Sequence, residues 1–185
     1  ENQLCLTNPD VLRIITERIK DRIRKDPGAR FYGVSQDDHQ NYCRCANCAA
    51  VDAEEGSHAG CVVRFVNAVA AEVEKEFPGA VIETLAYQYS RFPTKRTRLR
   101  HNVVPCICTI ECGFGPDPIV AGTTDANRKF VELLRGWKEQ TDELYVWDYT
   151  TNFRDYCHIF PNLNVLQANI RFFRDNHVRY LFEQG

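Results

Sequence analysis

Residues 62–87 read VVRFVNAVAAEVEKEFPGAVIETLAY, and this stretch decides the fold. Its apolar positions recur with the three- and four-residue spacing of an amphipathic helix. These positions are Val62, Phe65, Val66, Val69, Val73 and Phe77. Pro78-Gly79 ends the helical pattern, and the run 81–87 that follows is typical of a strand. The stretch therefore predicts a helix, a tight turn and a strand.

The same order of elements occurs earlier in the chain. Asn8-Pro9-Asp10 offers an N-cap, a proline suited to the first helical position and an acid at the positive end of the helix dipole. One face of the predicted helix then carries Val11, Ile15, Ile19 and Ile23. Asp26-Pro27-Gly28 ends it, and a strand is expected at 31–35. Both turns contain Pro-Gly-Ala, at 27–29 and 78–80.

Three more strands are expected, at 103–110, 144–149 and 178–182. The last two follow apolar stripes that predict helices. The stripes consist of Phe130, Val131, Leu134 and Trp137, and of Leu163, Leu166, Ile170 and Phe173. About five strands alternating with helices predict an α/β fold with parallel strands. An open doubly wound sheet can use five strands, whereas a complete TIM barrel needs eight. We expect a single domain over residues 1–185, a partial TIM (β/α) barrel.

Composition excludes several classes of protein. The chain has 185 residues, of which 44% are hydrophobic and 26% charged, with a net charge of −2. Disorder and nucleic-acid binding are therefore not expected, and the basic run 95–100 is expected to be a solvated loop. No apolar run approaches the roughly 20 residues that span a bilayer, and no nucleotide-binding glycine motif occurs. The sequence contains no Met, so we expect a processed or excised piece. We find no signal-peptide pattern in it, and we expect the full-length protein to be secreted or periplasmic.

Polar and aromatic residues follow every predicted strand. In parallel α/β folds, ligands bind at the carboxyl ends of the strands. These ends carry Asp37, Asp38, Tyr87, Tyr89, Glu111, Trp147, Asp148, Tyr149, Glu183 and Gln184. Acids beside aromatic rings suit a sugar, whose hydroxyls need acceptors and whose C–H faces stack on rings. Individual acids can instead cap the helices that follow.

Glycoside hydrolysis needs a carboxylic acid to protonate the leaving oxygen, and a second carboxylate or a substrate group opposite. Asp38 is the first candidate for the general acid/base. Asp37, Glu111, Asp148 and Glu183 are the candidate partner carboxylates. Sugar contacts are expected from Tyr87, Tyr89, Trp147, Tyr149 and Gln184. No cofactor is required for this chemistry.

The nine cysteines form the other local motif. Cys43, Cys45 and Cys48 can take three corners of a tetrahedral zinc site, with Cys61 or His58 as a fourth ligand. Disulfides and free thiols packed as small hydrophobic side chains are the alternatives.

Several segments together resemble a bacterial domain family of unknown function that is grouped with the glycoside-hydrolase TIM barrels. The carriers are 4–9 (LCLTNP), 34–38 (VSQDD), 43–48 (CRCANC), 64–67 (RFVN), 85–87 (LAY), 147–149 (WDY) and 182–185 (FEQG). The resemblance implies the later part of a barrel, about strands four to eight. It also implies distant kinship to β-hexosaminidases and α-glucuronidases. In hexosaminidases an Asp-Glu pair follows the fourth strand; here the place reads Asp37-Asp38.

Three functional hypotheses follow. The first is a carbohydrate-active hydrolase, and the second is a non-catalytic carbohydrate-binding or scaffold barrel. The third is a metal-dependent module built on the cysteines. The outer strands of a partial barrel expose backbone edges, so self-association into a homo-oligomer is also expected.

Overall fold

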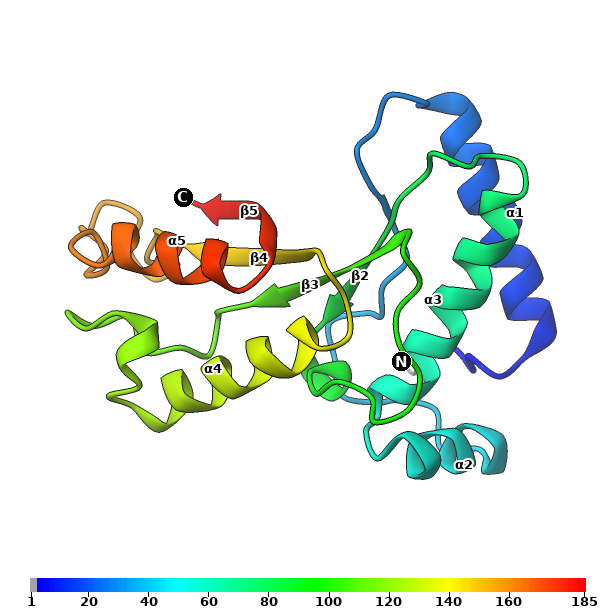
Figure 1. The fold of residues 1–185 in the computed structure, drawn as a ribbon, viewed down its shortest axis with the longest axis horizontal. Coiled ribbons are helices and arrows are strands. Elements are labelled where there is room, and N and C mark those ends of the chain that lie inside the picture. Colours follow the sequence, from blue (N-terminus) through cyan, green and yellow to red (C-terminus); the bar gives the residue numbers. More distant parts are fainter. Residues whose placement is uncertain (1–2) are drawn as a thin grey trace. The chain divides into compact units, whose positions relative to one another are not determined.

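A computed structural model of the protein describes residues 3–185, in which helices and strands alternate (Figure 1). The helices are α1 (Pro9–Lys25), α2 (Ala46–Glu55), α3 (Ala59–Glu74), α4 (Asp125–Lys138) and α5 (Leu166–Asp175). The strands are β1 (Tyr32–Gly33), β2 (Ile82–Ala86), β3 (Val103–Cys108), β4 (Leu144–Tyr149) and β5 (Val178–Gln184). Two 3-10 helices, η1 (Gln88–Ser90) and η2 (Ile119–Ala121), follow β2 and β3.

The strands of the described residues form one sheet in the order β1-β2-β3-β4-β5. The pairs β1–β2, β3–β4 and β4–β5 are parallel. Strands that neighbour one another in the sheet are consecutive in sequence, as in a (β/α) barrel. The predicted fold class, an α/β partial barrel of five parallel strands, is confirmed. The chain divides into two compact units, Glu1–Pro105 and Cys106–Gly185, here called unit 1 and unit 2.

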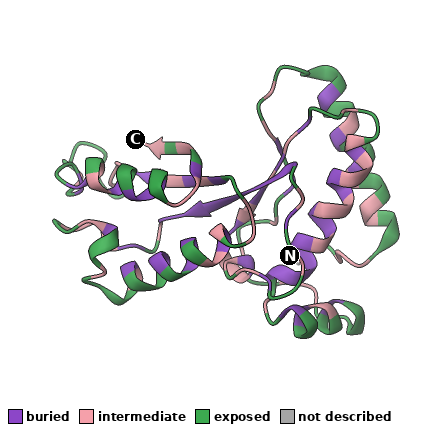
Figure 2. Cartoon of the chain, viewed as in Figure 1, coloured by how far each residue is buried: buried purple, intermediate pink, exposed green. Residues whose placement is uncertain are grey.

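Unit 1 has its core on α3. Val66, Val69 and Val73 are at most 1% exposed, and α1 packs along this helix with Ile19 and Ile23 buried (Figures 1 and 2). The start of α1 follows the sequence, since Pro9 is its first residue and the Asn8 side chain accepts a hydrogen bond from the Asp10 N–H (2.8 Å). Apolar burial therefore fixes the helix pair of this unit.

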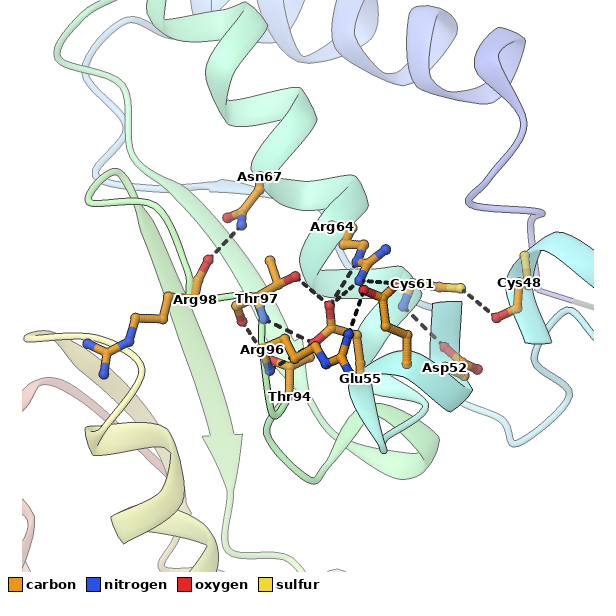
Figure 3. Close-up of polar contacts among 11 residues, drawn as sticks. Cys48, Asp52, Glu55, Cys61, Arg64, Asn67, Thr94, Arg96, Thr97 and Arg98 are labelled. Atoms are coloured by element: carbon orange, nitrogen blue, oxygen red, sulfur yellow. Dashed lines mark hydrogen bonds and ion pairs between the residues drawn. The ribbon is translucent and has the colours of Figure 1, made fainter. Parts of the chain in front are cut away.

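A buried ion pair between Glu55 of α2 and Arg64 of α3 anchors the basic loop 95–100 within unit 1 (Figure 3). Glu55 is 0% exposed and accepts hydrogen bonds from Arg64 Nε (2.8 Å) and from the backbone N–H groups of Arg96 (3.1 Å) and Thr97 (3.0 Å). Burial alone would raise the pKa of Glu55, but the hydrogen bonds from Thr97, Arg64 and Arg96 outweigh it and lower the pKa to about 2. The loop is thus anchored at its backbone, while the Lys95, Arg96 and Arg98 side chains are exposed as predicted.

Unit 2 has an aromatic core between α4, α5 and the sheet. Phe130 of α4 meets Phe173 of α5 edge to face, with ring centroids 6.2 Å apart. Trp137 is buried, as are Leu144 and Val146 of β4. The apolar stripe of α4 therefore has the packing role that its spacing predicts. None of the described helices combines the length and the apolar composition needed to cross a membrane.

Three elements differ from the sequence prediction. The first strand covers only Tyr32–Gly33 rather than 31–35, because the Ser35 hydroxyl, not a backbone carbonyl, accepts the Leu85 N–H (3.0 Å) and ends the ladder. Helix α2 was not predicted; it begins at the Cys45 N-cap and ends at Gly56, whose φ of 64° is left-handed. The predicted stripe of α5 was wrong at two positions, because Leu163 precedes the helix and is 59% exposed, and Ile170 lies in the helix but is 44% exposed.

Candidate functional site

The predicted site residues of unit 1 lie where β1 and β2 end. Asp37 and Asp38 are exposed, and Asp38 Oδ1 accepts a hydrogen bond from the side chain of Gln88 (3.0 Å). The Asp37 backbone N–H donates to Gln3 Oε1 (3.0 Å). Tyr87 and Tyr89 follow β2 directly, so the structure brings the ends of these two strands together through Asp38 and Gln88.

Four cysteines of unit 1 form a cysteine centre. The Sγ atoms of Cys5, Cys43, Cys45 and Cys48 all lie within 4.8 Å of one another, a spacing at which they can hold a metal ion. Cys5 lies 3.7 Å from Cys45 and 3.8 Å from Cys48, measured between sulfur atoms. All cysteines are free thiols in this structure.

The fourth sulfur belongs to Cys5, which sequence reasoning did not place in the site. Cys61 instead donates from Sγ to the Cys48 carbonyl (3.4 Å), and His58 Nδ1 pairs with Asp52 (2.9 Å). Neither residue belongs to the four-cysteine group. The long separation of Cys5 from the 43–48 motif gave no spacing signal, and only the path of the segment before α1 brings it there.

The pKa values of two thiols in the centre, Cys43 and Cys45, are shifted in opposite directions. The Cys48 N–H donates to Cys45 Sγ (3.5 Å), and this bond at the start of α2 lowers the pKa of Cys45 to about 6. The backbone of Cys45 likewise favours the Cys43 thiolate, but burial and the neighbouring thiols outweigh it and raise the pKa of Cys43 to about 12. A cation among the sulfurs would remove this conflict, because metal ligation requires thiolates.

Two carboxylates of unit 2 face the same side of the sheet. Asp148 of β4 and Glu183 of β5 are register partners on adjacent parallel strands, so their side chains project together. Thr109 donates to Asp148 Oδ1. Asp148 Oδ2 and both Glu183 oxygens are buried without a hydrogen-bond partner among the described residues. Buried polar atoms in a purely structural site normally form hydrogen bonds, so the three oxygens without partners favour a functional role for this pair.

Burial raises the pKa of both carboxyl groups. For Asp148 the hydrogen bonds from Thr109 and the Tyr149 N–H partly oppose this rise. For Glu183 burial, assisted by the negative charge of Asp148, raises the pKa to about 7. Glu183 is therefore a carboxyl group that can give or take a proton near neutral pH.

The predicted sugar-binding aromatics of unit 2 lie on the opposite face of the sheet. Trp147 stacks on Tyr149 (ring centroids 6.4 Å apart) and donates from Nε1 to Gln184 Oε1 (2.8 Å). Alternation along β4 places Asp148 on one face and these rings on the other. Glu111, expected as a partner carboxylate, is exposed in the loop after β3.

A hollow of about 490 Å³ opens beyond the carboxyl ends of β3 and β4 in unit 2. This aromatic hollow is lined by Ile110, Phe114, Tyr149, Thr151, Asn152, Phe153, Arg154 and Phe160. Phe114 lies 5.0 Å from Phe160 and 6.2 Å from Tyr149 between ring centroids. Sequence reasoning found Tyr149 and missed the other rings, because they sit in loops that carry no periodic pattern.

Fold and sites together define an α/β partial-barrel protein with a cysteine centre in one unit and, in the other, an aromatic hollow and a pair of carboxyl groups. The chain matches the family model described as a domain of unknown function (DUF4838) over residues 1–185, and it belongs to that family. The predicted membership of a family of unknown function is thus confirmed, while the relation to glycoside-hydrolase barrels stays a prediction. No curated protein and no solved structure matches the chain.

Proposed function

We propose that this protein is a carbohydrate-active hydrolase that binds sugar in the aromatic hollow of unit 2. The hollow itself is the observation that carries the proposal. Four rings from separate segments, Phe114, Tyr149, Phe153 and Phe160, line one cavity together with the polar side chains of Asn152 and Arg154. Rings stack on the C–H faces of a sugar, while amide and guanidinium groups bind its hydroxyls.

The paired carboxyl groups of unit 2, Asp148 and Glu183, are our candidates for the acid chemistry, although neither is among the residues that line the hollow. In the proposed reaction, Glu183 donates its proton to the glycosidic oxygen as the bond to the anomeric carbon breaks. Water then adds to that carbon and gives its proton to the ionised Glu183, which restores the acid. Burial, assisted by the negative charge of Asp148, raises the pKa of Glu183 to about 7, so that the carboxyl group can hold a proton near neutral pH. Glu111, in the same unit, remains a candidate for the second carboxylate, and Asp37 and Asp38 of unit 1 stay predicted carboxylates.

Binding is tested by isothermal titration calorimetry with neutral xylo-, cello- and chito-oligosaccharides. We expect at least one of them to bind, and Phe153→Ala and Phe114→Ala to weaken binding about tenfold, since stacking on a ring contributes roughly 1 kcal/mol or more. Leu163→Ala is the matched control, because Leu163 is an exposed apolar side chain of unit 2 that does not line the hollow (59% exposed, against 45% for Phe153). Absence of binding, or equal loss in the control, contradicts the proposal.

Catalysis is tested on aryl glycosides of the sugars that bind. We expect Glu183→Gln to lower kcat by about a hundredfold or more while leaving binding intact. The same assay of Asp38→Asn decides whether Asp38 takes part. Binding without turnover would instead support the alternative function, a non-catalytic carbohydrate-binding barrel.

We also propose that the cysteine centre holds a structural zinc ion. In a tetrahedral site with Zn–S bonds of about 2.3 Å, sulfur atoms lie about 3.8 Å apart. The Cys5–Cys45 and Cys5–Cys48 separations of 3.7 and 3.8 Å fit that spacing, whereas a disulfide joins its sulfurs at about 2.05 Å. The ion would tie the segment before α1 to the start of α2.

Elemental analysis of the purified chain tests the zinc proposal. We expect stoichiometric zinc, lost from Cys5→Ser and Cys45→Ser and kept in Cys157→Ser, which changes an exposed cysteine outside the centre. Retention of zinc in Cys5→Ser, or metal-free wild type with cross-linked cysteines, would contradict it.

A further inference from the structure

A second hollow, of about 620 Å³, lies in unit 1 beside α2. We call it the His58 hollow. Its lining includes Tyr42, Arg44, Gly56, His58, Tyr89 and Phe92. The proposed hydrolase chemistry uses none of its polar groups. The hollow combines a fixed imidazole, an arginine without an ion-pair partner among the described residues, and an exposed ring.

The imidazole of His58 is held in one orientation. Its Nδ1 lies 2.9 Å from Asp52 Oδ2, and the other Asp52 oxygen accepts the Cys61 N–H (3.2 Å), as Figure 3 shows for Asp52 and Cys61. Asp52 is 8% exposed, and the Tyr42 ring stacks on the imidazole with centroids 4.0 Å apart. Because a carboxylate accepts, Nδ1 carries the proton and Nε2 presents a lone pair.

The Nε2 atom of His58 can accept a hydrogen bond from a ligand. Among the described residues, His58 Nε2 makes no hydrogen bond. Aspartate and histidine in this arrangement fix both the tautomer and the ring orientation. A hydroxyl group entering the hollow can donate to Nε2 without any rearrangement of the protein.

One cation, Arg44, lines the hollow, and a second, Lys95, lies against the lining residue Gly56. Arg44 lies over the Tyr42 ring, 5.3 Å from its centroid. Lys95 covers Gly56, where an added Cβ would lie 2.7 Å from Lys95 Nζ. Neither side chain forms an ion pair within residues 3–185. Arg44 is the positively charged side chain that lines the hollow and can receive an anion, whereas the lining acid, Asp52, is engaged by His58 and Cys61.

An exposed ring completes the set. Phe92 lines the hollow and is 60% exposed, although an isolated phenylalanine gains from covering its face. A ligand that fits this hollow therefore has an apolar ring face, a hydroxyl donor and a negative charge.

We propose that the His58 hollow binds an acidic sugar, with a ring hydroxyl donating to His58 Nε2, the carboxylate at Arg44, and the sugar face on Phe92. The choice of a sugar for the ring rests on the proposed function. The position and the charge of the ligand rest on unit 1 alone.

The experiment compares galacturonate with galactose, which differ only in the carboxylate, by calorimetric titration of the whole chain. We expect galacturonate to bind at least tenfold more tightly than galactose, since a charge-assisted hydrogen bond adds that much. Arg44→Gln, Phe92→Ala and His58→Phe should each weaken galacturonate binding about tenfold. His58→Phe keeps a ring against Tyr42, and melting curves confirm that each variant is folded.

Phe153→Ala, in the aromatic hollow of unit 2, is the matched control and should leave galacturonate affinity unchanged. Equal affinity for the two sugars, or galacturonate binding that is lost in Phe153→Ala and kept in Phe92→Ala, would overturn the inference while leaving the unit 2 proposal in place. Galacturonate binding that depends on His58, with no neutral oligosaccharide bound, would support this inference and contradict the unit 2 proposal instead.

Discussion

Replacing Glu55 by Gln tests the buried ion pair that holds the basic loop on unit 1. The pKa of Glu55 is about 2 in the folded chain, against 4.5 for an ordinary glutamate. One pKa unit corresponds to about 1.4 kcal/mol, so the folded state favours the ionised form by roughly 3 kcal/mol. Glu55→Gln removes this contribution and leaves Arg64 with Glu54 alone, at 2.9 Å. We therefore expect the free energy of unfolding to fall by roughly 3 kcal/mol, which is within the range known for breaking a buried ion pair.

Urea unfolding at pH 7 measures this loss, and thermal unfolding should show a melting temperature about 6–12 °C lower. The pH dependence has a definite sign. Since the folded pKa is the lower one, the contribution of Glu55 is present in full above about pH 4.5 and is lost as the pH falls toward about 2. The difference in stability between wild type and Glu55→Gln should therefore shrink over that interval.

Glu54→Gln is the control, because Glu54 contacts the same Arg64 but has a side chain that is 44% exposed. Exposed pairs contribute about 0–1 kcal/mol, so this variant should stay close to wild type. Equal losses in the two variants, or a Glu55→Gln loss below about 1 kcal/mol that does not vary with acid, would refute the reasoning.

Three further predictions concern other parts of the chain. Glu183→Gln should raise the free energy of unfolding at pH 8 by up to about 3 kcal/mol and change it little at pH 4. The reason is that a carboxyl group with a pKa of about 7 destabilises the fold once it is ionised. Urea unfolding at both pH values measures the difference. Asp148→Asn should lower the pKa of Glu183 in an NMR titration of its carboxyl carbon, since the Asp148 charge contributes to the rise. Gly56→Ala should destabilise the chain by about 1–2 kcal/mol in urea unfolding, since φ is 64° there and Lys95 occupies the space of a Cβ. A Gly79→Ala variant, with open space around it, is the control for the last.

The sequence predicts the fold well where local signals and burial agree. The helix of α1 begins at Pro9 behind its Asn8 cap, and α3 buries the stripe that its spacing indicates. Helix α2 escaped prediction because its start depends on a cysteine sulfur as N-cap and its residues show little amphipathic pattern. The first strand is shorter than its composition suggests, because the Ser35 side chain replaces a backbone acceptor.

The site is less predictable, because its parts meet only through the fold. Cys5 joins Cys43, Cys45 and Cys48 through a path that no spacing reveals. The pairing of Asp148 with Glu183 depends on a register shift at Leu144/Tyr145 between β4 and β5. Alternation along a strand, by contrast, already implies that Asp148 and Trp147 face opposite sides. That the acids and rings at the carboxyl ends of the strands form one ligand site remains a prediction.

An NMR titration of the isotopically labelled chain with the neutral oligosaccharides tests the proposed carbohydrate function most directly. Saturable shifts should concentrate on Phe114, Tyr149 and residues 152–154, which line the aromatic hollow. Shifts confined to other surfaces, or none with any oligosaccharide at millimolar concentration, would contradict a sugar site in unit 2.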